Sequence, residues 1–491
     1  MTGADATGDD GLRRKIVTGV SWKLGGQVVQ QCTSTAVALV LVRLLSPSDF
    51  GIAAMALAFT GLALLLTDVA LSATLIQRPS ITQADCSTAF WTTLGAGAVV
   101  SLAGIALAPL VASFFSTPDV EALFAVAWGG AFISALGMTQ SALLTREMDF
   151  RGIELRDMAA TAASGGLALV LAALGAGAWA LVAYSLAFSA TSTLLVWRLS
   201  PWRPTWEISR ESLRRLAPFG LKVSASRLLG YLNLNADNIL VGRYLGTTAL
   251  GSYAVAYNVV YLPTARLTQP IQDVLFAGLS RLQEDPARLG RAWLRGNALI
   301  VTVAAPAFLG MAVVAPDFVP VVLGDRWSDA VPVLQLLSLA GIAQALTALN
   351  WSAMQAVGQA GALLRFMVFS TAVTVAGFVT GLVWGIAGVA GMFAASRFVV
   401  AVCFAWLVGR AVAVPLRAFV RAQLPALVLG ASMAAVVLVA RLGLLETSLP
   451  AAARLVVLVA LGIAVYAALV MWRAPALVAE LRGLRRRVET A

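Results

Sequence analysis

The chain has 491 residues, of which 59% are hydrophobic and 12% charged, with a formal net charge of +11 and a mean hydropathy of +0.85. A soluble chain carries about 25% charged residues, and open strands cannot satisfy their backbone groups in lipid. We therefore expect an all-α integral membrane protein. The chain contains no histidine, which excludes His-based catalysis and most zinc chemistry. We expect no catalytic residue, no metal site and no cofactor.

Apolar runs follow one another along nearly the whole chain and predict about fourteen transmembrane helices of ~20 residues each. The first run follows Arg13, Arg14 and Lys15 and is longer than the core of a signal peptide, so we expect no cleavage. The expected spans are residues 16–42, 51–75, 86–112, 121–144, 157–175, 178–197, 217–242, 251–276, 293–316, 331–355, 366–385, 388–409, 423–440 and 451–472.

Basic residues are divided unequally between the two sets of loops. Most of the 35 Lys and Arg lie in the loops on the side of the two termini, whereas the opposite loops hold Arg43, Arg243, Arg326 and Arg441. Basic loops stay in the cytoplasm. We therefore expect a multi-pass protein of the cell (cytoplasmic) membrane with both termini in the cytoplasm. Cations in short loops do not form a continuous stripe, so we expect no nucleic-acid binding.

One turn of the sequence occurs twice. The stretch "RLLSPSDFG" joins spans 1 and 2, and "RYLGTTALG" joins spans 7 and 8. Other landmarks recur in the same order, so the spans predict two parallel six-helix bundles around a central cavity, a plan that transporters use. The expected parts are 1–205 (first bundle), 206–415 (second bundle), 416–475 (transmembrane helices 13 and 14) and 476–491 (a basic cytoplasmic tail).

Two of the expected helices carry polar residues at helical spacing, and these stripes are the candidate cavity lining. A polar stripe facing lipid is costly, so both should face a shared cavity. Span 1 contributes Lys23, Gln27, Gln30 and Ser34; span 7 contributes Lys222, Asn233 and Asp237. The alternative for both lysines is snorkelling to the cytoplasmic interface. Arg227, on another face of span 7, suits a ligand role or an ion pair with an acid such as Asp237.

Arg266 lies in the middle of span 8, between Pro263 and Pro270, in "YLPTARLTQP". Prolines at these places favour a broken helix, and charged groups at broken helices mark transporter sites. Gln269 and Asp273 share the face of Arg266. The alternative is a structural ion pair between Arg266 and Asp273. Embedded cations exceed embedded acids, which favours an anionic substrate, with phosphate as the natural candidate.

Several stretches resemble a known family of transporters. The stretches "LVRLLSPSDFGIAAMALAF", "TDVALSATLIQR" and "NADNILVGRYLGTTALGSYAVAYNV" look like the polysaccharide-export, or O-antigen, flippases. These form a branch of the multidrug/oligosaccharidyl-lipid/polysaccharide (MOP) exporter superfamily. The resemblance covers most of residues 15–410.

The resemblance implies a flippase that moves a polyprenyl-pyrophosphate-linked oligosaccharide, a repeat unit of a lipopolysaccharide or exopolysaccharide, across the membrane by alternating access. Lys23, Lys222 and Arg266, with Arg227 as a further candidate, would bind the pyrophosphate. Spans 13 and 14 would offer an apolar groove to the lipid tail. Membrane lipids, a polysaccharide polymerase and a chain-length regulator are the expected partners. Coupling to an H⁺ or Na⁺ gradient fits this class of transporter.

Two other functions are compatible with the spans alone. A drug/cation antiporter of the same superfamily would need embedded acids rather than surplus cations. A membrane polysaccharide polymerase or glycosyltransferase would need a long extracytoplasmic loop with acidic residues, and the outer loops of this chain are short.

Overall fold

The computed structural model describes residues 4–68, 71–214, 231, 235–264, 271–272, 275, 278–279, 282 and 285–473. Regular structure in these ranges is helical throughout, which confirms the all-α fold. Ten stretches among them are long and apolar enough to cross a membrane. The count of fourteen spans stays a prediction.

The chain divides into two compact units, Met1–Gly251 and Ser252–Ala491. The first unit extends beyond the predicted first bundle, 1–205, and includes the second copy of the repeated turn. The predicted parts, 1–205, 206–415 and 416–475, rest on repeated sequence and stay a prediction. The tail after residue 473 lies outside the described residues.

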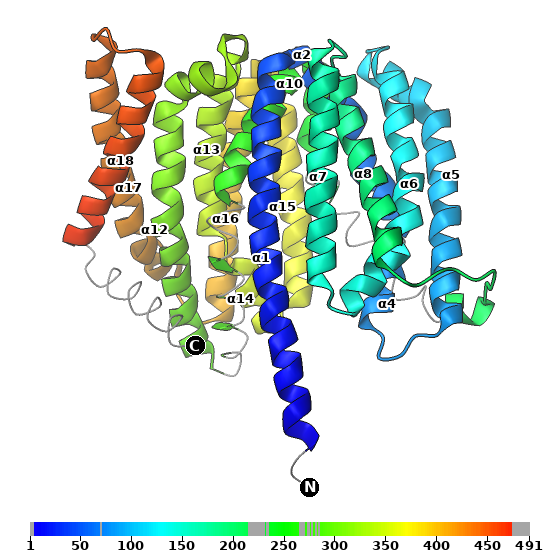
Figure 1. The fold of residues 1–491 in the computed structure, drawn as a ribbon. Coiled ribbons are helices and arrows are strands. Elements are labelled where there is room, and N and C mark those ends of the chain that lie inside the picture. The colour runs from blue at the N-terminus through cyan, green and yellow to red at the C-terminus, as the bar shows by residue number, and fades with distance from the viewer. Residues whose placement is uncertain are drawn as a thin grey trace. The chain divides into compact units, whose positions relative to one another are not determined.

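The helices of the first unit follow the predicted order. They are α1 (Ala4–Leu44), α2 (Pro47–Leu57), α3 (Thr60–Asp68), α4 (Leu71–Gln77), α5 (Gln83–Phe115), α6 (Val120–Arg146), α7 (Phe150–Ala173) and α8 (Trp179–Leu199). α6 contacts α5 and α8, α8 contacts α7, and α7 contacts α1, so these five helices lie side by side (Figure 1). Small residues allow close approach: Gly104 of α5 lies against the ring of Trp128 of α6.

The second unit contains the remaining helices. They are α10 (Thr247–Pro263), which begins in the first unit, α12 (Pro286–Phe318), α13 (Ala330–Leu346), α14 (Asn350–Ala356), α15 (Ala360–Gly381), α16 (Gly385–Ala411), α17 (Leu416–Leu445) and α18 (Ala451–Arg473). α12 contacts α13, α17 and α18, and α16 contacts α13 and α15. α17 and α18 therefore form a pair on one side of α12 (Figure 1).

Two predicted spans are interrupted. Span 2 is divided into α2, α3 and α4, and the carbonyl of Ala58, at the first break, accepts a hydrogen bond from the hydroxyl of Tyr231. Span 10 is divided into α13 and α14, where Asn350 accepts a bond of 2.9 Å from the indole of Trp293. Each break leaves backbone groups without a partner in the helix, and the side chains of Tyr231 and Trp293 stabilise the interrupted conformation.

The two copies of the repeated turn pack against each other within the first unit. The hydroxyls of Ser48 and Thr247 lie 3.0 Å apart. A Cβ at Gly51 would overlap the carbonyl of Thr247, and one at Gly251 would overlap the carbonyl of Pro47. Glycine in both copies is therefore required by the close approach of two backbones.

Large apolar side chains cover the outside of the long helices. Val99 and Leu102 of α5 are each 67% exposed, and Ile463 of α18 is 68% exposed. Apolar surface of this extent on helices of membrane-spanning length faces lipid. The chain is a multi-pass membrane protein.

Candidate functional site

The polar stripe predicted on span 1 lies on α1. Lys23 and Gln27 are exposed, whereas Gln30 and Ser34 are half-buried. The amide Nε2 of Gln30 donates a hydrogen bond of 3.3 Å to Oγ1 of Thr161 on α7, and Ser34 donates to the carbonyl of Gln31 in its own helix. The middle of the stripe therefore faces α7.

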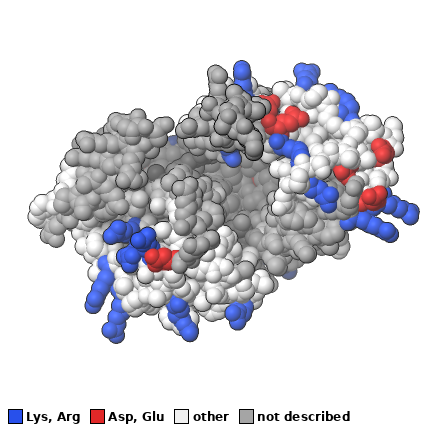
Figure 2. Space-filling model, turned by 90° about the horizontal axis from the view of Figure 1, so that it is seen from below, with Lys and Arg blue, Asp and Glu red and all other residues white. Residues whose placement is uncertain are grey.

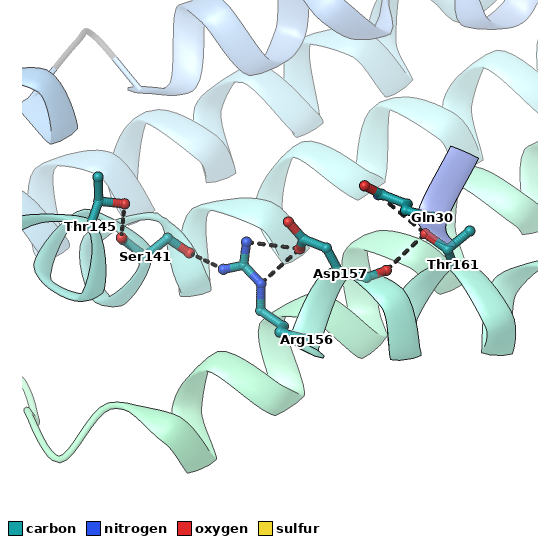
Figure 3. Close-up of polar contacts among 6 residues, drawn as sticks. All are labelled: Gln30, Ser141, Thr145, Arg156, Asp157 and Thr161. Carbon is teal, nitrogen blue, oxygen red and sulfur yellow. Dashed lines mark hydrogen bonds and ion pairs between the residues drawn. The ribbon is translucent and has the colours of Figure 1, made fainter. Parts of the chain in front are cut away.

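α7 carries a polar network where it meets α1 and α6 (Figure 3). We call Gln30, Ser141, Arg156, Asp157 and Thr161 the α7 cluster. Nε and NH2 of Arg156 each lie 2.9 Å from Oδ1 of Asp157, and NH1 donates a bond of 2.7 Å to the hydroxyl of Ser141 on α6. Thr161 donates to the carbonyl of Asp157. The guanidinium of Arg156 is thus held on two sides.

Glu154 is a buried carboxylate near the start of α7, one turn before Asp157 of the α7 cluster. It is 6% exposed, and its side chain lies so close to Gly26 of α1 that a Cβ there would overlap it. Lys23, Asp157 and Arg156 all act on it electrostatically. The exposed lysine of the α1 stripe is therefore neighboured by a buried acid on α7.

Most of the other predicted site residues lie outside the described residues. These are Lys222, Arg227, Asn233, Arg266, Gln269 and Asp273. Asp237 is described: it is 4% exposed, and its Oδ1 accepts a bond of 2.8 Å from the backbone N–H of Asn238. The roles predicted for all seven residues stay predictions.

An apolar groove lies between α12, α17 and α18, and its volume is about 540 Å³. Its walls include Gly310 and Met311 of α12, Met433 of α17, and Gly462 and Ile463 of α18. α17 and α18 contain the predicted spans 13 and 14, so an apolar groove lies where one was expected.

Beside this groove, one buried acid binds two arginines. Oδ2 of Asp317 on α12 lies 2.5 Å from Nε of Arg441 on α17, and Oδ1 lies 2.6 Å from Nε of Arg454 on α18. The side chain of Asp317 is 1% exposed and those of the arginines 17%. We call these three residues the α12 triad. It links three helices and leaves one positive charge over.

Sequence reasoning missed Glu154, Asp157 and Asp317 as candidates. The predicted span 5 starts at residue 157 and leaves Glu154 in a loop, whereas α7 starts at Phe150. A usable signal was present: Glu154, Asp157 and Thr161 recur at i, i+3 and i+7, on one helical face. The predicted span 9 ends at residue 316, one residue before Asp317, whereas α12 continues to Phe318.

Basic side chains mark one end of each unit. In the first unit Arg146 is the last residue of α6 and Arg151 lies in the first turn of α7; in the second, Arg410 lies in the last turn of α16 and Arg417 in the first turn of α17. Figure 2, seen from below Figure 1, shows many Lys and Arg side chains among the described residues, with small groups of Asp and Glu near some of them. No group of three or more Cys, Asp or Glu within the described ranges could hold a metal ion.

Comparison with known proteins gives a family and a fold. Residues 40–332 match the family model Polysacc_synt_3, described as polysaccharide biosynthesis protein. The chain is 28% identical over 372 residues to the lipopolysaccharide biosynthesis protein WzxC of Escherichia coli, an alignment that covers 75% of this chain and 76% of that protein.

Solved structures of two transporters have the same fold. The lipid II flippase MurJ in an inward closed conformation superimposes with a TM-score of 0.74 at 11% identity, over 94% of this chain and all of MurJ. An inward-facing multidrug resistance MATE transporter of the MOP superfamily gives 0.63 at 18% identity, over 79% of this chain and 95% of that one. The resemblance to the polysaccharide-export flippases is confirmed, and the chain belongs to the polysaccharide biosynthesis protein family, on the fold of the MOP superfamily.

Proposed function

We propose that this protein is a flippase that moves a polyprenyl-pyrophosphate-linked oligosaccharide from the cytoplasmic to the outer leaflet by alternating access. The family supports a role in polysaccharide biosynthesis, and the names of WzxC and MurJ point to lipopolysaccharide and to a lipid-linked substrate. The protein is a transporter and not an enzyme.

The apolar groove is the observation that carries the proposal. A lipid-linked oligosaccharide has a long apolar tail and a polar headgroup, and transport of both requires two different surfaces. The groove between α12, α17 and α18 offers an apolar surface for the tail. The exposed Lys23 and Gln27 on α1 offer polar groups suited to a pyrophosphate and a sugar.

The orientation and energy source belong to the same proposal. Both termini are cytoplasmic, because the end of each unit that carries Arg146 or Arg410 is basic. An H⁺ or Na⁺ gradient drives transport, and Glu154 and Asp157 are carboxylates on a membrane-spanning helix that suit such an ion. A polymerase and a chain-length regulator act on the flipped product.

The proposal is tested by filling the groove. Gly310→Leu adds a branched side chain to its wall, where the nearest atom to an added Cβ would be Cε of Met433 at 3.8 Å. We expect the variant to be as abundant as the wild type and to lose most surface polysaccharide in a strain lacking its own flippase. Gly443→Leu on α17, where nothing lies within 4 Å of the added Cβ, is the matched control and should complement fully.

Failure of the wild-type chain to restore surface polysaccharide in a strain that makes its lipid-linked precursor would contradict the proposal. Full restoration of surface polysaccharide by Gly310→Leu would show that the groove does not hold the lipid tail.

A further inference from the structure

The α12 triad lies at one end of the groove: Arg441 and Arg454 lie one helical turn beyond the groove residues of α17 and α18, and Asp317 precedes the groove residue Phe318 of α12. Asp317 follows the groove residue Val314 at i+3, Arg441 follows Val437 at i+4, and Arg454 precedes Leu458 by four. Residues three and four apart share one face of a helix. The triad therefore sits at one end of the groove, on the faces that line it.

The two arginines have hydrogen-bond donors to spare. A guanidinium carries five N–H donors, and Arg441 and Arg454 each reach Asp317 through Nε. Their terminal NH1 and NH2 groups make no hydrogen bond to any other described residue. These four nitrogens are also not fully buried, so a ligand can reach them. Asp317 orients two guanidiniums and neutralises one of them.

A dianionic oxygen cluster suits this arrangement. Arginine forks match phosphate oxygens in pairs, and the triad carries a net charge of +1 before any ligand binds. A ligand that reaches both the triad and the groove must have an anionic head and an apolar chain. The lipid of the proposed function is such a ligand, because it carries a pyrophosphate on one prenyl chain, and the lining of the groove is apolar.

We propose that Arg441 and Arg454, held by Asp317, bind the phosphate or pyrophosphate of a prenyl-linked lipid whose chain lies in the groove. The proposal rests on the function proposed above and adds a second anion site to it. With cytoplasmic termini, α12 and α17 end and α18 begins at the outer face. The site therefore holds the lipid head after it has crossed, whereas the cations of α1 would meet it before.

The test compares three lipids on the purified full-length chain in detergent: a polyprenyl phosphate, the matching polyprenol, and phosphatidylglycerol. A ligand of the folded state raises the melting temperature with its concentration. We expect the polyprenyl phosphate to bind the wild type at least tenfold more tightly than the polyprenol. Arg454→Gln and Arg441→Gln should each reduce phosphate-lipid binding about ten- to a hundredfold and leave polyprenol binding unchanged.

Two further variants keep the test decisive. Arg441→Lys retains a cation for Asp317 and removes the fork, so it should fold even if Arg441→Gln does not, and should bind the phosphate lipid several-fold more weakly. Arg410→Gln, at the other end of the second unit, removes an arginine that lies 5.0 Å from the ring of Trp406 and should bind like the wild type.

Equal binding of polyprenyl phosphate and polyprenol by the wild type, or unchanged binding by all three triad variants, would show that the triad only fastens α17 and α18 to α12. Stabilisation by phosphatidylglycerol equal to that by polyprenyl phosphate would overturn the choice of a prenyl lipid. These outcomes are separable from the proposed function. If the wild type restores surface polysaccharide but lipid binding does not depend on the two arginines, only the site at the α12 triad is ruled out. If lipid binding depends on the arginines but the wild type does not restore surface polysaccharide, only the transport function is ruled out.

Discussion

The α7 cluster and the α12 triad both contain ion pairs where helices meet, half-buried in the first and buried at Asp317 in the second, and they use their arginines differently. In the α7 cluster, one arginine serves one carboxylate: Arg156 binds Asp157 through two nitrogens and Ser141 through the third. In the α12 triad, two arginines share one carboxylate, each through a single nitrogen.

This difference separates a structural contact from a binding surface. A guanidinium whose three nitrogens are all engaged is fixed in position, and it has little to offer a ligand. A pair of guanidiniums that are oriented by one acid and retain their terminal donors can accept an anion without first breaking a contact. The contrast predicts that the α7 cluster only stabilises the packing of α1, α6 and α7. The α12 triad, by contrast, should stabilise its helices and also bind the anionic head of the lipid.

Removal of the acid should have the largest effect, and a larger one in the α12 triad. Asp317→Ala leaves two adjacent arginines without their counter-charge, and breaking a buried ion pair in this way costs about 3–5 kcal/mol. Asp157→Ala should cost about 1–3 kcal/mol, because Asp157 is 22% exposed and Arg156 keeps Ser141. Unfolding of both purified variants in the same detergent measures the difference. Equal losses would mean that the two networks are equivalent.

Where α1 packs on α7, we expect replacement of Gly26 by alanine to destabilise the protein and replacement of the neighbouring Gly25 to be tolerated. A Cβ at Gly26 would overlap the side chain of Glu154, whereas one at Gly25 would meet nothing within 4 Å. Gly26→Ala should therefore destabilise the protein by about 1–3 kcal/mol, and Gly25→Ala should be neutral or stabilise it by up to about 1 kcal/mol. Melting temperatures of the two variants provide the comparison. Similar values for both would show that α1 is not tightly packed on α7 at Gly26.

The sequence predicted most helices because membrane spans are long and apolar, and this pattern does not depend on tertiary contacts. Span 9, for example, lies within α12 and span 14 coincides with α18 to within a residue. The repeated turn also indicated a real contact, since both of its glycines are required where the two copies meet.

The α12 triad could not be predicted in the same way, because its residues lie at helix ends. A hydropathy window ends at the first charged residue, and so it placed Arg441 in a loop although α17 continues to Leu445. Asp317 and Arg454 are 137 positions apart, and nothing in the sequence pairs them. The breaks within spans 2 and 10 were missed because side chains from other helices stabilise them.

Replacement of arginine by lysine should distinguish the networks by a smaller amount. Arg156→Lys loses the bond to Ser141 as well as the fork to Asp157, and should cost about 1–2 kcal/mol, because lysine offers a point charge in place of a planar fork. Arg454→Lys should cost less than about 1 kcal/mol, since Arg454 reaches Asp317 through Nε alone and one ammonium can replace that bond. Denaturant midpoints of the two variants would test this order. The reverse order would contradict the distinction between engaged and spare donors.

The smallest effect is expected at the edge of the α7 cluster, where Gln30 of α1 meets Thr161 of α7. Their hydrogen bond is long, at 3.3 Å, and neither side chain depends on it. Gln30 is only half-buried, and the hydroxyl of Thr161 donates its own hydrogen bond to the carbonyl of Asp157. Hydrogen bonds between membrane helices contribute on average about 0.6 kcal/mol by double-mutant cycle. The cycle Gln30→Ala, Thr161→Ala and the double variant should give a coupling energy of about that size or less. A coupling above about 1.5 kcal/mol would show that Gln30 belongs to the structural network rather than to the polar surface that Lys23 and Gln27 present.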